Sequence, residues 1–210
     1  MIFLWTILYG LAYTLPVLYA NSAWTTSICI SIYILLLIGW LIHSRRTAYV
    51  RLHRIHAIKP KDLPDFLPLL ILPICNLPTT CPPLAVAVLM VCVSIAEEIL
   101  FRGVLLRFFQ KSGNFRSILA CAIIFALFHG VNLLNGGNLT AVLLQILCAA
   151  GAGFLYGALT LKWNTILPAI TGHILTNITG IGSTSAPSEL LLCSIICFIW
   201  GIWIYKSIDT

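Results

Sequence analysis

Long apolar runs alternate with short polar breaks along the whole chain. Seven of these runs approach the roughly 20 residues that a helix needs to cross the hydrocarbon core of a membrane. They lie at Ile2–Ala20, Thr26–His43, Leu84–Arg107, Ser117–Leu134, Leu139–Leu161, Thr165–Gly182 and Ser188–Tyr205. The pattern predicts a polytopic membrane protein built from helices.

An eighth apolar run, Phe66–Pro78, is shorter and contains Pro68, Pro73 and Pro78. A straight helix of this length would reach only about 20 Å, which is short of the roughly 30 Å hydrocarbon core. The run could cross as broken backbone covered by protein, or it could enter the membrane and return.

The positions of the basic residues favour a crossing. Loop 45–61 contains six lysines and arginines, so it is expected on the cytoplasmic side of the membrane. If the eighth run crosses, the basic residues that follow it fall on that same side: Arg107, Lys111, Arg116, Lys162 and Lys206. If it returns, all of them lie outside, against the charge bias. We therefore predict an all-α bundle of about eight transmembrane segments, with both termini in the cytoplasm.

The composition agrees with a membrane protein. The 210 residues are 60% hydrophobic and 9% charged, which excludes an ordinary soluble domain. The net charge of +6 would suggest nucleic-acid binding in a soluble protein. Here the bias of basic residues toward the cytoplasm explains it, so we expect the lipid bilayer as a partner and no nucleic acid. The host membrane would be the plasma (inner) membrane in a prokaryote or the endoplasmic reticulum in a eukaryote.

Ionisable residues interrupt three of the predicted spans. Measured from the cytoplasmic ends of their helices, Glu97 lies about 15 Å deep, His129 about 18 Å and His173 about 13 Å. Charged groups at such depths are costly and are usually functional or paired. Their similar depths predict that the three side chains share one polar pocket.

Helical spacing separates the two adjacent glutamates. Glu98 and Arg102 are four residues apart with the acid first, so we expect them to pair on one helix face and to support the site. Glu97 points about 100° away around the helix and has no such partner. This makes Glu97 the better candidate for a general base.

His173 and Asn177 are also four residues apart and face the same way. Both can donate hydrogen bonds, which suits an anion that develops on a carbonyl oxygen during acyl transfer. Phe125 shares a helix face with His129 and is expected to pack at the pocket wall. Spacing leaves a metal open, because Glu97, His129 and His173 could also form a three-ligand zinc site.

Three motifs follow one another on successive predicted helices. They are Glu97-Glu98-x-x-x-Arg102, Phe125-x-x-x-His129 and His173-x-x-x-Asn177. In this order they resemble the CPBP family of intramembrane proteases, also called the Abi or CAAX prenyl protease 2-like family. The resemblance covers about residues 84–182 and extends more loosely to residue 205. We therefore divide the chain into an N-terminal transmembrane region, residues 1–83, and a catalytic helix bundle, residues 84–205.

The resemblance implies an endopeptidase whose active site lies within the membrane. Its substrate would be a membrane-associated protein or peptide, as in the processing of CAAX proteins or in peptide maturation and immunity. By resemblance, Glu97 and His129 activate a water, His173 and Asn177 form the oxyanion hole, and Glu98 and Arg102 support the site. The family has been described both as glutamate-dependent and as metal-dependent, so zinc stays open as a cofactor.

Two other functions are compatible with the same residues. A proton-coupled transporter could use the glutamate and histidine side chains as a relay, although the sequence shows no internal inverted repeat. A non-catalytic immunity protein on the same fold would keep the motifs only as structural polar contacts. Flux without proteolysis would indicate the first, and a phenotype that survives loss of both Glu97 and His129 would indicate the second.

Overall fold

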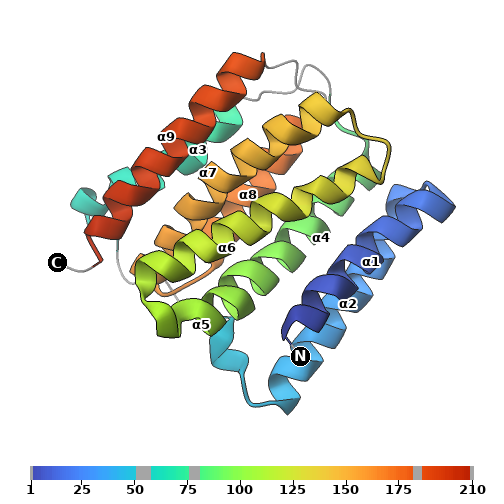
Figure 1. Ribbon diagram of the computed structural model, residues 1–210, viewed down its shortest axis with the longest axis horizontal. Coiled ribbons are helices and arrows are strands. Elements are labelled where there is room, and N and C mark those ends of the chain that lie inside the picture. The colour runs from blue at the N-terminus through green and yellow to red at the C-terminus, as the bar shows by residue number, and fades with distance from the viewer. Residues whose placement is uncertain (1, 51–57, 76–80, 182–185, 209–210) are drawn as a thin grey trace.

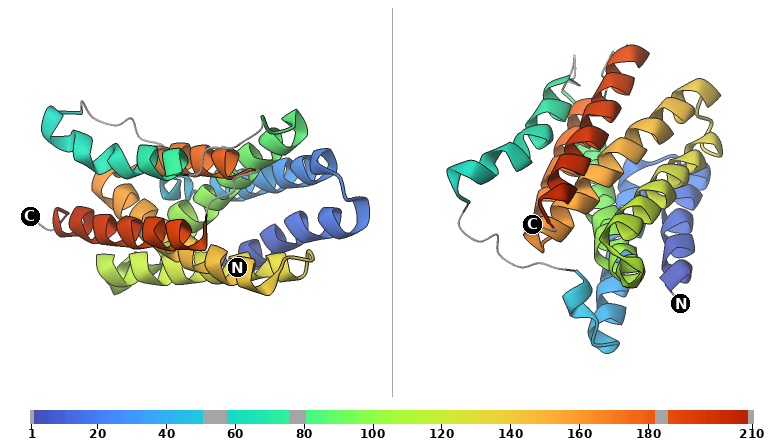
Figure 2. Two further views of the ribbon diagram at one scale, coloured as in Figure 1. Left: turned by 90° about the horizontal axis from the view of Figure 1, so that it is seen from above. Right: turned by 60° about the vertical axis from the view of Figure 1, so that its left-hand side comes forward.

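The computed structural model describes residues 2–50, 58–75, 81–181 and 186–208, and these residues are almost entirely helical. Helices α1 and α2 lie together at one side of the bundle, and α3 and α9 lie at the other (Figure 1; Figure 2). Helices α4, α6, α7 and α8 run between them. The predicted all-α membrane bundle is confirmed.

Six helical stretches in the described chain are long and apolar enough to cross a membrane, judged by length and composition. They are α1 (Ile2–Ala20), α2 (Ala23–His43), the α4–α5 stretch (Leu84–Ser112), α6 with its extension (Asn114–Leu133), α7 (Leu139–Trp163) and α9 (Pro187–Lys206). Two helices are shorter, α3 (Leu67–Cys75) and α8 (Leu167–Gly180). The 3₁₀-helices η1 (Thr47–Tyr49) and η2 (Pro60–Phe66) lie between α2 and α3.

Contacts just after α2 show how α2 is oriented relative to α4. Gly103, near the end of the α4–α5 stretch, lies against the backbone of Tyr49 and Val50, which follow α2. Helices α2 and α4 therefore run parallel, and the chain between them must return to the opposite end of the bundle. The described residues between the two helices include η2 and α3 (Figure 1), and the crossing of the eighth run stays a prediction. Residues 76–80 lie outside the described part of the chain.

A buried carboxylate fastens η2 to the rest of the bundle. Asp65 is 1% exposed and accepts hydrogen bonds from Lys162 Nζ at 2.9 Å and from Trp163 Nε1 at 3.0 Å, both at the end of α7. Trp200 Nε1 of α9 donates to the Pro64 carbonyl at 3.1 Å. Hydrogen bonds to α7 and α9 thus hold the short helix η2 against the bundle.

We expect Asp65→Ala to lower the free energy of unfolding by about 1–3 kcal/mol, because it leaves the Lys162 and Trp163 donors without their acceptor. Thermal unfolding in detergent measures this loss. Asp62→Ala is the matched control, since its carboxylate accepts an exposed hydrogen bond from the Lys59 backbone. Equal losses in the two variants would contradict the structural role of Asp65.

Small residues let α7 lie close to its neighbours. The Cα of Gly151 lies against the Ser194 carbonyl of α9, where a side chain would clash. Gly153 packs tightly, though less so, against Ala122 and Phe125 of α6. Close approach through small residues is typical of helices packed in membranes. It makes α7 a central helix, and one wall of the site described next lies on it.

Candidate active site

Helix α4 (Leu84–Glu98) widens into a π-helix, Ile99–Leu105, directly after the two glutamates. The sequence predicted one helical span here, Leu84–Arg107, and gave no sign of the π-helix. All seven residues of the π-helix are buried, and Arg102 is 1% exposed, so the wider turn is accommodated inside the bundle. π-Helical turns are rare and occur frequently at functional sites.

Glu98 is the centre of a buried charge cluster. Its Oε1 accepts hydrogen bonds from Arg102 Nη1 and from His173 Nδ1, each at 2.8 Å. The predicted pair of Glu98 and Arg102 is therefore present. The Arg102 guanidinium also lies 4.2 Å from the centre of the Phe125 ring, a cation–π contact. The bond to His173 was not predicted, and it ties α8 to α4.

Glu97 has a partner that the sequence did not reveal. The Tyr9 hydroxyl of α1 donates to Glu97 Oε1 at 2.7 Å. The other oxygen, Oε2, lies 3.5 Å from His173 Nε2 and makes no hydrogen bond with any described residue. Glu97 thus has one oxygen, Oε1, fixed by a hydrogen bond and one, Oε2, without a hydrogen bond to the described residues.

His129 stands at the point where α6 (Asn114–Phe128) tightens into the 3₁₀-helix η5 (His129–Leu133). Its backbone N–H bonds to the Ala126 carbonyl, and its ring Nδ1 bonds to the Phe125 carbonyl at 2.9 Å. Because a carbonyl oxygen only accepts, Nδ1 carries the proton. Nε2 of the neutral ring is then free to accept one.

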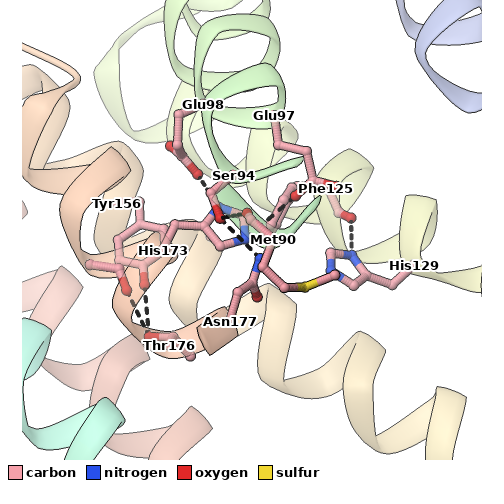
Figure 3. A network of polar contacts seen from close by, with 12 residues as sticks. Met90, Ser94, Glu97, Glu98, Phe125, His129, Tyr156, His173, Thr176 and Asn177 are labelled. Carbon is pink, nitrogen blue, oxygen red and sulfur yellow. Dashed lines mark hydrogen bonds and ion pairs between the residues drawn. The ribbon is translucent and has the colours of Figure 1, made fainter. Parts of the chain in front are cut away.

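Asn177 is held beside the same cluster, one turn of α8 beyond His173. Its Nδ2 donates to Ser94 Oγ at 3.0 Å, and Ser94 Oγ donates in turn to the Met90 carbonyl at 2.7 Å. The Asn177 amide has a second N–H that this bond does not use. Figure 3 shows the side chains of Glu97, Glu98, His129, His173 and Asn177 near one another, from α4, η5 and α8.

Two cavities meet at the cluster. One, of about 170 Å³, lies between α7, α8 and α9 and is lined mostly by apolar side chains; we call it the apolar cavity. The other, of about 130 Å³, is lined by Tyr9, Tyr13 and Glu97 among others; we call it the polar cavity. Four residues line both: His129, Gln145, His173 and Asn177. All four predicted catalytic side chains therefore face the polar cavity.

Residues 79–179 match the family model described as Rce1-like, type II CAAX prenyl endopeptidase. This segment, just under half of the chain, is similar to that family. No curated protein and no solved structure gives a match. The Rce1-like segment contains every residue of the three motifs, so the predicted resemblance is confirmed. It indicates an intramembrane protease, in agreement with the integral, multi-pass membrane fold.

The zinc site predicted from the sequence would be formed by Glu97, His129 and His173, which all line the polar cavity. Across the described residues, no group of three or more His, Cys, Asp or Glu side chains is placed to hold a metal ion. Peptide hydrolysis by the side chains of this site is written without a metal. Zinc dependence stays a prediction, and activity with and without a chelator tests it.

Two residues at the site were missed from the sequence. Ser94 lies three residues before Glu97, about one helical turn away, and that spacing could have indicated it. Tyr9 lies outside the Rce1-like segment, 88 residues from Glu97. A tyrosine in an apolar span is ordinarily a packing residue, so its own sequence context gave no signal.

Proposed function

We propose that the protein is an intramembrane endopeptidase that hydrolyses a peptide bond in a membrane-associated substrate of the CAAX type. One observation carries the proposal: within an Rce1-like segment, a carboxylate oxygen of Glu97 without a hydrogen bond to the described residues and the imidazole of His129 line one cavity with His173 and Asn177. Two proton acceptors and two hydrogen-bond donors around one space are the groups that peptide hydrolysis needs.

Glu97 and His129 would activate the water. A water in the polar cavity would lie between Glu97 Oε2 and His129 Nε2, both of which can accept its proton. As the proton leaves, the water oxygen bonds to the carbonyl carbon of the substrate. The tetrahedral intermediate then collapses with cleavage of the C–N bond, and the proton returns to the leaving nitrogen.

The oxyanion would be stabilised by the free N–H of Asn177 and by His173 Nε2. Since Nδ1 of His173 donates to Glu98, Nε2 can donate only in the imidazolium form. The carboxylates of Glu97 and Glu98, at 3.5 Å from Nε2 and 2.8 Å from Nδ1, would stabilise the charge of that form.

The two cavities suggest how a substrate would lie. The scissile bond would sit where they meet, beside His129, His173 and Asn177. The apolar cavity would take an apolar side chain next to that bond, and the bilayer would hold the membrane anchor of the substrate.

We expect His129→Asn to lower kcat about 10²–10⁴-fold, because asparagine cannot take up a proton. Cleavage of a farnesylated CAAX peptide in proteoliposomes measures the rate, and the unmodified peptide shows whether the lipid matters. His43→Asn is the control, since His43 is exposed at the end of α2, away from the site. It should keep the wild-type rate.

Two outcomes would overturn the proposal. The first is a folded His129→Asn protein that cleaves at the wild-type rate. The second is wild-type protein that moves protons or solutes across the vesicle membrane and cleaves no peptide, which would establish the transporter instead.

A further inference from the structure

One wall of the polar cavity comes from outside the Rce1-like segment. Tyr9 and Tyr13, four residues apart on α1, both line it. Helix α1 packs beside α2 at the edge of the bundle, and it reaches the site through this face (Figure 1). Residues 79–179 alone therefore leave the cavity open on one side.

Tyr9 is held firmly in this wall. The side chain is 2% exposed, and its ring stacks on Phe128 at 5.5 Å and packs on Tyr33 of α2 at 5.5 Å. Phe128 directly precedes His129. One ring thus contacts the helix end that carries His129, while its hydroxyl bonds to Glu97 at 2.7 Å.

The two oxygens of Glu97 consequently have different surroundings. Oε1 accepts a hydrogen bond from the Tyr9 hydroxyl, whereas Oε2 lies 3.5 Å from His173 Nε2 and has no hydrogen bond with the described residues. The terminal torsion of a glutamate has a broad energy profile, so a carboxylate without a fixed partner samples many orientations. The Tyr9 bond restricts this rotation.

We propose that Tyr9 is a positioning residue for Glu97, so that the active site is completed by α1. Its hydroxyl fixes Oε1 and thereby presents Oε2 to the water and to the substrate carbonyl. The proposal rests on the proposed peptidase function. Misplacement of a reacting group by about 1 Å can cost on the order of 10²-fold in rate, which sets the scale of the effect.

The chain offers a closely matched control for the Tyr9 hydroxyl. Tyr33 is 3% exposed, its ring lies against Tyr9, and its hydroxyl has no hydrogen-bond partner among the described residues. Tyr9→Phe and Tyr33→Phe each remove one buried hydroxyl and keep the ring. Only the first removes a contact to Glu97.

We expect Tyr9→Phe to lower kcat about 10–100-fold with KM within about twofold of wild type, since the hydroxyl acts on the chemical step. Tyr33→Phe should leave both constants within about twofold. The assay is cleavage of the farnesylated peptide in proteoliposomes by the full-length chain. Equal rates in the two variants, or a change confined to KM, would overturn the positioning role.

A double-mutant cycle separates positioning from a general loss of packing. If Tyr9 acts through Glu97, Tyr9→Phe should cause no further decrease in the residual rate of Glu97→Gln. A decrease by the same factor in both backgrounds would show that the hydroxyl acts elsewhere.

If wild-type protein cleaves nothing, the proposed function itself fails. If wild type is active, His129→Asn is inactive and Tyr9→Phe matches wild type, only the role of Tyr9 fails.

Discussion

Glu97→Gln is expected to lower kcat about 10³-fold while the protein stays folded. The glutamine keeps the length of the side chain, and its amide oxygen can still accept the Tyr9 hydroxyl. It cannot take a proton from water. The measurement is single-turnover cleavage of the farnesylated peptide, with thermal unfolding recorded on the same preparation.

The control for this change is Glu189→Gln. Glu189 is exposed at the start of α9, where its carboxylate accepts a hydrogen bond from the Ala186 backbone. Its loss should leave the cleavage rate within about twofold, as expected for a surface change away from the site. A Glu97→Gln protein that cleaves as fast as this control would refute Glu97 as the base. If the cellular phenotype also survived, a non-catalytic immunity role would be favoured.

Glu98→Leu is expected to lower the free energy of unfolding by about 3–5 kcal/mol, because Arg102 is then left as a buried charge without its partner. Arg102 is 1% exposed and Glu98 is 0% exposed, so water does not replace the lost bond. Denaturant unfolding in detergent measures the change. Unchanged stability would show that the Glu98–Arg102 pair does not hold the helix.

The double variant Glu98→Leu/Arg102→Met separates folding from activity. Replacing both members of a buried ion pair by apolar residues is often nearly neutral for stability, so most of the loss should be recovered. Activity should stay low, because His173 Nδ1 still lacks the acceptor that Glu98 provides. Full recovery of activity would mean that Glu98 acts only through Arg102.

Phe125 contacts the site through both its side chain and its backbone carbonyl. The Phe125 ring lies under the Arg102 guanidinium and packs edge-on against His173, with the ring centres 5.7 Å apart. The Phe125 carbonyl holds the His129 ring through Nδ1. Phe125 thus supports the charge cluster with its ring. Its carbonyl binds Nδ1 of His129, so Nε2 is the nitrogen of His129 that this bond leaves unused. Sequence spacing predicted only its packing at the pocket wall.

Several features could be predicted from the chain alone because they depend on local geometry. The membrane spans follow from apolar runs, since the thickness of the bilayer fixes the length of a helix that crosses it. The pair of Glu98 and Arg102 follows from four-residue spacing, and the similar depths of Glu97, His129 and His173 follow from the rise of the helix. These regularities hold whichever helices become neighbours.

The remaining features depend on which helices meet. The Tyr9–Glu97 bond joins residues 88 positions apart, and the His173–Glu98 bond joins residues 75 positions apart. No local periodicity encodes such contacts, because they arise from the packing of α1 and α8 against α4. The π-helix around Arg102 likewise forms within a fully buried part of the core. The sequence thus predicted which side chains lie in apolar spans, and only the tertiary structure decided which oxygen of Glu97 accepts the Tyr9 hydroxyl and which has no hydrogen bond with the described residues.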